Sequence, residues 1–394
     1  MTDTAASEGA ARLAMPVTDE ALARRLGERM GLVEQALAGH VRSRAPFVTH
    51  AASHLMEAGG KRFRPLLVLL AAEAGPRPDS DDVITAACVV EHALAGHVRS
   101  RAPFVTHAAS HLMEAGGKRF RPMLVLLAAE TGSHPDADAV IDAACVVELT
   151  HVGSLYHDDV MDEAAVRRGA DSANARWDNH VAILTGDFLF AKSSELTASL
   201  GPDAVRIQAE TFARLVEGQI LETVTPKGDA LAHYLDVIAG KTGSLIATSA
   251  RYGAMFAGAP EEVVTALTSY GEKVGVAFQL SDDILDIASE SVESGKTPGT
   301  DLREGVPTLP GLIARKSEDP ADARLLELLD SDLTDDTLHA EALRLLRAHP
   351  AMAAARDYVA SEANEAKRLL GVLPEGPVRT ALETFADVVA DRPS

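Results

Sequence analysis

The chain has 394 residues, of which 46% are hydrophobic and 4% aromatic, and its formal net charge is −21 at pH 7. This length and apolar content suit a large buried core and exclude a disordered chain. The negative charge argues against a nucleic-acid partner, because phosphate backbones would be repelled.

Residues 1–20 lack the basic start and apolar core of a secretory signal. The longest apolar runs are far shorter than the roughly 20 residues that a membrane span needs. We therefore expect a cytoplasmic protein without a transmembrane segment.

Helix-forming residues dominate most of the chain. Residues 1–17 are small and polar, and we expect a flexible N-terminus there. From Thr18, a suitable helix N-cap, alanine and leucine are frequent and alternating β-branched residues are rare. Residues 18–394 are therefore predicted to form a single large helical bundle of the all-α class. The expected helices include 139–164, 176–199, 202–224, 229–256, 260–290, 320–347 and 351–370.

A tandem duplication occupies the first part of this domain. Residues 36–91 and 93–148 are nearly identical, with the first thirty positions of each copy unchanged. Two units are too few for a solenoid, which needs at least three. We expect the second copy to be the functional one, because it joins directly to the next predicted helix.

Two aspartate clusters lie in apolar helical segments. In each, the first and last aspartates are four residues apart, so they share one helix face. Carboxylates gathered at one cavity would be untenable without a divalent cation, and hard oxygen ligands suit Mg²⁺ shared with substrate phosphates. The clusters consist of Asp158, Asp159 and Asp162, and of Asp282, Asp283 and Asp286.

Basic residues accompany both clusters. Three cations occur in the segment 116–121, just after a glycine pair, and Arg167 and Arg168 follow the first cluster. Lys241 precedes the second cluster and Lys296 follows it. A site for polyanionic diphosphates requires such cations, whereas an isolated Lys or Arg is usually solvated.

The motifs GGKRFRP, HDDVMDEAAVRRG, GDFLF, KTGSLI, FQLSDDILD and GKTPGTDLREGVPTLP occur in this order. Over about residues 93–390, the chain resembles the trans-isoprenyl (polyprenyl) diphosphate synthase family. The resemblance implies an all-α homodimer in which two aspartate motifs face each other across the mouth of a deep central cavity. It also implies an enzyme that condenses isopentenyl diphosphate head-to-tail (1′-4) with an allylic diphosphate, with about three Mg²⁺ ions per active site.

The resemblance assigns roles residue by residue. It implies metal ligation by Asp158, Asp162, Asp282 and Asp286. It implies catalytic roles for Asp158, Asp159, Asp162, Lys241, Asp282 and Asp283. Isopentenyl diphosphate would bind Lys118, Arg121, His151 and Arg168. The allylic substrate would contact Arg167, Lys241, Thr242, Gln279 and Lys296. By itself, His151 would more often be a packed core histidine. The sequence departs from many family members at Val306, where they have a lysine, which puts one diphosphate contact in doubt.

Product length is expected to depend on the helix that carries the first motif, along which a growing chain descends in this family. Gly153 and Ser154, five and four residues before Asp158, are too small to form a floor. We therefore expect an all-trans product longer than C20. A geranylgeranyl or farnesyl diphosphate synthase stays open, because other helices can supply the floor.

Two other interpretations are weaker. A terpene cyclase also uses a DDxxD motif, but it needs no basic site for a second diphosphate, and its second motif normally has an NSE pattern. A non-catalytic partner subunit tends to lose one or both acidic motifs, and both are intact here.

Overall fold

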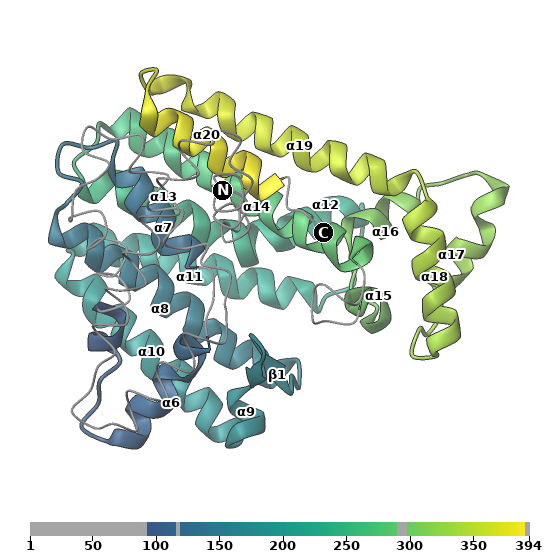
Figure 1. Ribbon diagram of the computed structural model, residues 1–394, viewed down its shortest axis with the longest axis horizontal. Helices are drawn as coiled ribbons and strands as arrows, with labels where there is room; N and C mark the ends of the chain where they lie inside the picture. The colour runs from purple at the N-terminus through teal and green to yellow at the C-terminus, as the bar shows by residue number, and fades with distance from the viewer. Residues whose placement is uncertain (1–92, 116–118, 290–297, 391–394) are drawn as a thin grey trace, which may run out of the picture. The chain divides into compact units, whose positions relative to one another are not determined.

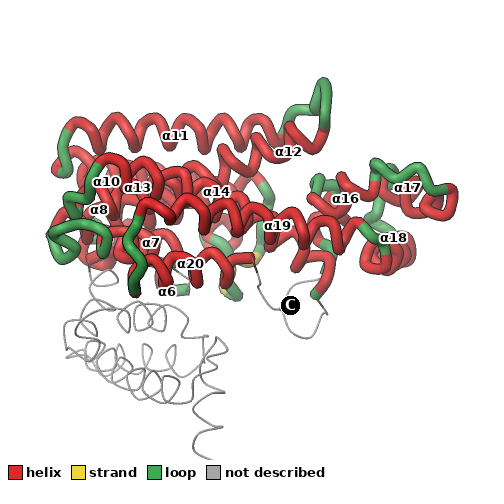
Figure 2. Tube along the Cα trace, turned by 90° about the horizontal axis from the view of Figure 1, so that it is seen from above, coloured by secondary structure: helices red, strands yellow, loops and turns green. Residues whose placement is uncertain are grey.

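The computed structural model describes residues 93–115, 119–289 and 298–390. Helices form nearly all of its regular structure, so the predicted all-α class is confirmed (Figures 1 and 2). The chain divides into two units. Unit 1 consists of the described residues up to Val205 with Tyr252–Ala259 and Glu375–Ala381, and unit 2 consists of the rest. The flexible N-terminus predicted for residues 1–17 and the first repeat copy lie outside the described residues.

Unit 1 is built around a long apolar helix, α8 (Asp138–Met161), against which α10 (Asn179–Ser199) packs. Three helices of this unit have an identifiable start signal. A proline opens α6, Ser172 caps α9, and Asp178 caps α10 by accepting a hydrogen bond from the backbone N–H of Val181 at 2.8 Å. The remaining helices of this unit are α6 (Pro103–Glu114), α7 (Phe120–Ala129) and α9 (Ala173–Arg176).

Helix α8 has the composition of a core helix. Among the described residues, it is the helix long and apolar enough to cross a membrane, but 67% of its most apolar window is buried inside the structure. Close approach of α10 depends on glycine, because a Cβ at Gly186 would lie 2.4 Å from the His157 ring and 3.0 Å from the carbonyl oxygen of Gly153. The helix ends at Met161, three residues before the predicted end.

A two-residue hairpin follows α8. Strands β1 (Val166–Arg167) and β2 (Ala170–Asp171) pair antiparallel. The two residues between them, Arg168 and Gly169, both have positive φ, at 56° and 79°. Positive φ at both central residues suits a tight turn that matches the twist of paired strands.

Unit 2 is also helical, and α14 (Glu261–Ala288) packs against α19 (Ala351–Leu369) within it. Its other elements are α12 (Ala230–Ile238), η1 (Ala239–Gly243), α15 (Thr300–Glu304), α16 (Leu309–Ala314), η2 (Pro320–Asp322), α17 (Ala323–Leu329), α18 (Asp336–Ala348) and η3 (Leu370–Val372). Helices α11 (Pro202–Glu222), α13 (Ser244–Phe256) and α20 (Pro377–Ala390) have residues in both units.

Two predicted helices depart from a regular α-helix. The helix predicted over 229–256 is continuous from Ala230 to Phe256, but it contains the π-helical turn η1 between α12 and α13. The prediction of one helix over 320–347 was wrong, since α17 ends at Leu329 and α18 starts only after Asp335, whose side chain caps it. Helix α20 was not predicted.

Candidate functional site

The first aspartate motif lies at the C-terminal end of α8 in unit 1. Asp158 is half-buried, Asp159 is buried and Asp162 is exposed. Asp162 follows the last helical residue, and its backbone N–H donates to the carbonyl oxygen of Asp158 at 2.8 Å. The predicted one-turn spacing of Asp158 and Asp162 therefore persists at the helix end.

Asp159 is tied to the hairpin that follows. Its Oδ1 accepts a hydrogen bond from Nε of Arg167 at 2.5 Å, whereas its buried Oδ2 has no hydrogen-bond partner. Burial raises the pKa of the Asp159 carboxyl, and the Arg167 guanidinium opposes this rise. Arg167 also lies 4.0 Å from Oδ2 of Asp162. This arginine thus joins two carboxylates of the first motif.

Arginine side chains surround His151 on α8. The pKa of His151 is well below its usual value, first because of burial and then because of the positive charges of Arg121, Arg168, Arg119 and Arg167. Burial also lowers the pKa of Arg121 to about 10, against the attraction of Glu148, and Nε of Arg121 has no hydrogen-bond partner. An anion would therefore be stabilised strongly here.

This cluster contains three of the four residues assigned to isopentenyl diphosphate: Arg121, His151 and Arg168. Lys118 lies outside the described residues. Arg168 is held at the hairpin turn, where its Nη1 donates to the carbonyl oxygen of Leu112 at 2.7 Å. The hairpin is fixed to α6 by a 2.8 Å hydrogen bond between the His111 ring and the carbonyl oxygen of Asp171.

Arg119 points inward and has a different role. Its Nη1 donates to Oε1 of Glu148 at 2.8 Å, its Nη2 donates to the Met113 carbonyl oxygen at 3.0 Å, and both charged side chains are buried. Arg119 also adopts a left-handed backbone conformation with φ of 46°. It anchors the start of α7, which carries Arg121. The motif letters alone did not distinguish this anchoring arginine from the ones expected to bind substrate.

The second motif lies in α14 of unit 2, and its central residue, Asp283, is buried in a hydrogen-bond network. The Tyr234 hydroxyl and the backbone N–H of Leu309 donate to Oδ2 of Asp283, the latter at 3.4 Å, and Nε2 of Gln279 donates to Oδ1 at 3.3 Å. Burial raises the pKa of Asp283 to about 7, the hydrogen bond from Tyr234 lowers it, and the charge of Asp301 raises it. Sequence reasoning missed Tyr234, which precedes this motif by 48 residues and carries no local signal.

The flanking aspartates of this motif differ from Asp283. Asp282 is half-buried. Asp286 accepts backbone hydrogen bonds at the start of α15: Thr300 N–H donates to its Oδ1 and Asp301 N–H to its Oδ2, both at 3.2 Å. The N–H of Gly299 also donates to the Asp286 carbonyl oxygen at 2.8 Å.

The π-helical turn η1 holds Lys241 and Thr242. Nζ of Lys241 donates to Oε2 of Glu222 at 2.6 Å, and Oγ1 of Thr242 donates to Oε1 of Gln279 at 3.2 Å. Single π turns in α-helices often occur at functional sites. Three predicted residues, Lys241, Thr242 and Gln279, are thus brought together in unit 2, whereas Lys296 lies outside the described residues. Glu222 was not predicted.

Glycines permit the close packing of this turn. A Cβ at Gly218 of α11 would lie 2.5 Å from the backbone nitrogen of Lys241, and one at Gly275 of α14 would lie 2.7 Å from Cα of Gly243. Any larger residue at either position would displace the turn.

The aspartates of the first motif suit a divalent cation that is shared with a substrate. Within the described ranges, no group of three or more His, Cys, Asp or Glu side chains could hold a metal ion. Mg²⁺, however, is usually bound by one or two carboxylates together with substrate phosphates, not by a cage of protein ligands. Paired carboxylates one turn apart, with a buried Asp159 oxygen lacking a hydrogen-bond partner, fit this mode.

The predicted chain-length residues pack toward α10. A Cβ at Gly153 would lie 3.0 Å from the ring of Phe190 and 3.3 Å from the Gly186 carbonyl oxygen. Phe190 packs edge-on against the His157 ring, with centroids 5.4 Å apart. The space beside Gly153 therefore contains an aromatic ring from a neighbouring helix. The sequence of α8 alone did not predict that Phe190 of α10 lies beside Gly153. Ser154 is half-buried and donates its hydroxyl to the His151 carbonyl oxygen at 2.9 Å.

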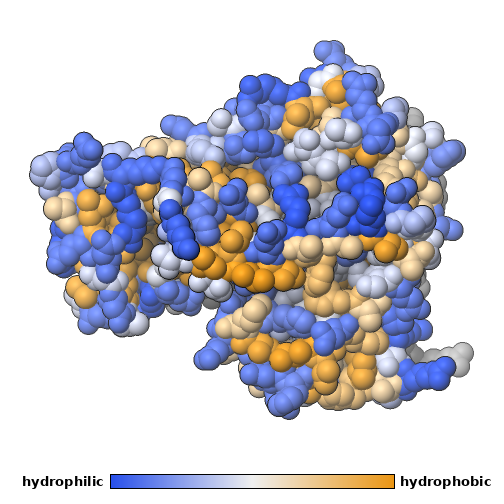
Figure 3. All heavy atoms as spheres, turned by 180° about the vertical axis from the view of Figure 1, so that it is seen from behind, coloured by the Kyte–Doolittle hydropathy of each residue, from blue (hydrophilic) through white to orange (hydrophobic). Residues whose placement is uncertain are grey.

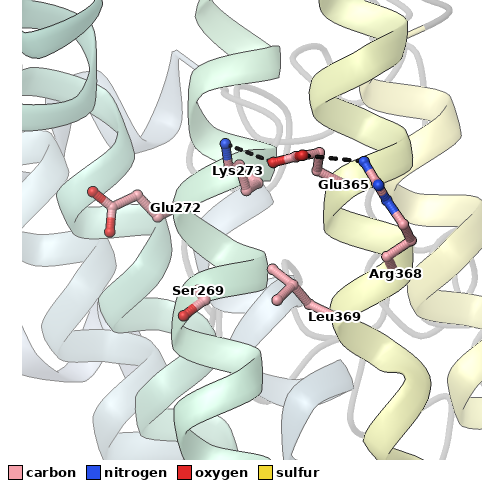
Figure 4. Close-up of a pocket in the computed structure, with 6 residues that line it drawn as sticks. All are labelled: Ser269, Glu272, Lys273, Glu365, Arg368 and Leu369. Atoms are coloured by element: carbon pink, nitrogen blue, oxygen red, sulfur yellow. Dashed lines mark hydrogen bonds and ion pairs between the residues drawn. The ribbon is translucent and has the colours of Figure 1, made fainter.

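A separate pocket of about 470 Å³ lies between α14 and α19 in unit 2 (Figure 4). Lys273 and Arg368 both point toward Glu365 there, each at 3.1 Å (Figure 4), and Lys273 also pairs with Glu362 at 3.1 Å, so two carboxylates balance the two cations. Lys273 precedes Asp282 by nine residues, or roughly 14 Å along the helix. This pocket is not formed by the predicted site residues.

Comparisons with known proteins agree with these features. A family model described as polyprenyl synthetase matches residues 102–346. The nonaprenyl diphosphate synthase of Mycobacterium tuberculosis is 50% identical over 322 residues, which cover 80% of this chain and 96% of the relative.

Solved structures of prenyl diphosphate synthases also resemble this chain. A geranylgeranyl pyrophosphate synthase from Corynebacterium glutamicum, complexed with calcium and isoprenyl diphosphate, is 46% identical with a TM-score of 0.72, covering 80% of this chain and 98% of that one. A decaprenyl diphosphate synthase from Rhodobacter capsulatus is 35% identical with a TM-score of 0.72, and the match covers 79% of this chain and 97% of that one.

Proposed function

Because the chain belongs to the polyprenyl synthetase family, we propose that it condenses isopentenyl diphosphate head-to-tail with an allylic prenyl diphosphate. The observation that carries this proposal is the arginine cluster around His151, which lies in the same unit as the first aspartate motif. A transferase that joins two diphosphates needs a cationic site for one of them and a metal-assisted site for the other.

Isopentenyl diphosphate binds the cationic cluster. Arg121 and Arg168 donate hydrogen bonds to its phosphate oxygens, and the buried Nε of Arg121, which lacks a hydrogen-bond partner, favours an acceptor here. His151 is neutral before the substrate binds, so it donates from one ring nitrogen only. Burial makes these contacts stronger than they would be in water.

Asp158 and Asp162 would hold Mg²⁺ shared with the allylic diphosphate, and Asp282 is proposed as a further Mg²⁺ ligand. The cation would supply Lewis-acid stabilisation of the departing diphosphate. Lys241 and Arg167 add positive charge to the leaving group. Thr242 and Gln279 orient their dipoles toward the allylic cation, and the double bond of isopentenyl diphosphate attacks that cation. Loss of a proton then restores the double bond, with the released diphosphate as the base.

We assign a product longer than C20. Support comes from Gly153 and Ser154, whose small size leaves no floor on α8, and from the likeness to nonaprenyl and decaprenyl synthases. Phe190 is the aromatic side chain nearest to Gly153, so any floor at this level comes from α10.

We also assign a cytoplasmic homodimer. Large apolar side chains are exposed on α10, where Ile183 is 42% and Leu184 is 66% exposed, and Ile220 of α11 is 59% exposed. Apolar residues also reach the surface on the face shown in Figure 3. Exposed apolar side chains in such number are typical of surfaces that associate.

The metal assignment is tested by two substitutions. Asp158→Ala and Asp282→Ala each remove a proposed ligand, and each should lower turnover by about 100-fold or more while the far-UV circular dichroism is unchanged. The measurement is incorporation of labelled isopentenyl diphosphate at saturating Mg²⁺. Near-normal turnover of either variant would refute the two-motif site.

A further inference from the structure

We propose that Asp286 is a positioning residue that fixes the start of α15 beside the second motif, and that it is not a ligand of Mg²⁺. This inference rests on the proposed function. It reassigns the last aspartate of the second motif, which the resemblance would make equivalent to Asp162 of the first.

The two motifs differ in what their last aspartates contact. Asp162 is exposed and its side chain lies near Arg167, at 4.0 Å. Asp286 is half-buried, and its two carboxylate oxygens accept the N–H groups of Thr300 and Asp301, at 3.2 Å each. Its backbone carbonyl accepts a third N–H, from Gly299, at 2.8 Å. Three successive amides are therefore bound by one residue.

These contacts satisfy backbone groups that would otherwise lack partners. The first N–H groups of a helix have no acceptor within the helix, and a carboxylate at this end also meets the positive end of the helix dipole. Mg²⁺ demands nearly ideal octahedral geometry. Both carboxylate oxygens of Asp286 are already oriented by backbone amides, which favours a role in positioning α15 over direct coordination of a metal.

Helix α18 also contacts the end of α14 and the segment before α15. The His339 ring hydrogen-bonds the Gly299 carbonyl oxygen at 2.8 Å. Arg347 donates from Nε to the Ile287 carbonyl oxygen at 2.6 Å and from Nη2 to the Ser289 carbonyl oxygen at 2.7 Å. The end of α14 and the start of α15 are thus both fixed to α18, and Asp286 joins them directly.

Asp286 also fixes the position of Asp301. Its charge raises the pKa of Asp283, so its carboxylate lies near that residue. Its carbonyl oxygen accepts the N–H of Val306 at 2.8 Å, which ties it to the segment leading to Leu309. By holding the backbone of Asp301, Asp286 sets the position of a further negative charge beside the second motif.

The test compares Asp286→Ala with Asp282→Ala and with the conservative Asp286→Asn. Amide hydrogen exchange of Thr300 and Asp301 is measured in the full chain without substrate, and the half-saturating Mg²⁺ concentration is measured during turnover. Asp286→Ala should speed exchange of both amides at least tenfold and change the half-saturating Mg²⁺ less than threefold. Asp286→Asn keeps one acceptor oxygen, so it should protect one of the two amides.

The control, Asp282→Ala, should leave both amides protected. Unchanged exchange of both amides in Asp286→Ala, or a rise of tenfold or more in its half-saturating Mg²⁺, would overturn the assignment. Failure of the proposed function looks different, because the unmodified chain would then show no Mg²⁺-dependent turnover while the exchange results would still stand.

Discussion

At the scale of single residues, His151 shows how burial, together with neighbouring cations, affects stability. Its pKa is lowered in the folded protein, so the unfolded chain binds its proton more readily. The free energy of unfolding should therefore reach its full value above about pH 6.5, the ordinary histidine pKa, and should fall as the pH drops below it.

The substitution His151→Gln removes this proton. Between pH 7.5 and 5.5, urea unfolding should show a shallower loss of stability in the variant than in the unmodified protein, by at most about 1.4 kcal/mol per pH unit. His180→Gln is the control, because the His180 side chain is 93% exposed. If stability falls with pH equally in His151→Gln and in the unmodified protein, the pKa of His151 is not lowered by folding.

The spacing of Asp158 and Asp162 was predictable from the motif, and the structure keeps the two residues one helical turn apart. The resemblance assigned Arg121 and not Arg119 to the substrate, but no pattern indicated what Arg119 contacts instead. Arg119 and Arg121 are two positions apart in one motif, yet Arg119 forms a buried ion pair with Glu148. That difference depends on the left-handed backbone at Arg119, which no local pattern specifies.

At the scale of elements, the turn η1 depends on glycine contacts. Gly218→Ala would place a methyl group 2.5 Å from the backbone nitrogen of Lys241 and displace the turn. We expect the KM for the allylic diphosphate to rise about tenfold and the free energy of unfolding to fall by about 1–3 kcal/mol. Gly228→Ala is a matched control, since a Cβ there meets nothing within 4 Å. If both variants have the KM of the unmodified enzyme, Gly218 does not position Lys241.

Long helices such as α10 and α19 were predictable because alanine- and leucine-rich segments end close to glycine or proline. The π turn was not, because one extra residue in a helix leaves the apolar pattern almost unchanged. The break between α17 and α18 was missed although it contains the N-cap Asp335, which lies among other acidic residues.

At the scale of the whole molecule, the duplication raises the question of which copy binds substrate. We propose that residues 18–394 form one domain in which the second copy is functional. Lys118→Ala with Arg121→Ala should raise the KM for isopentenyl diphosphate at least about 100-fold, because two charged contacts are lost. The matched pair Lys61→Ala with Arg64→Ala should change it less than about twofold. Reversed outcomes would show that the first copy forms the site.

A deletion tests the same proposal independently. Removal of residues 36–92 restores a single uninterrupted copy, and the shortened chain should keep turnover within about threefold of the full chain. Loss of activity in a deletion variant that remains helical by circular dichroism would show that the first copy is required.

The central claim is the reaction itself, and sizing of its products tests it most directly. The unmodified chain is incubated with Mg²⁺, labelled isopentenyl diphosphate and allylic primers of several lengths, and the dephosphorylated products are separated by length. The account predicts Mg²⁺-dependent all-trans products longer than C20. Products that stop at C15 would contradict the assigned length, and no incorporation with any primer would contradict the reaction.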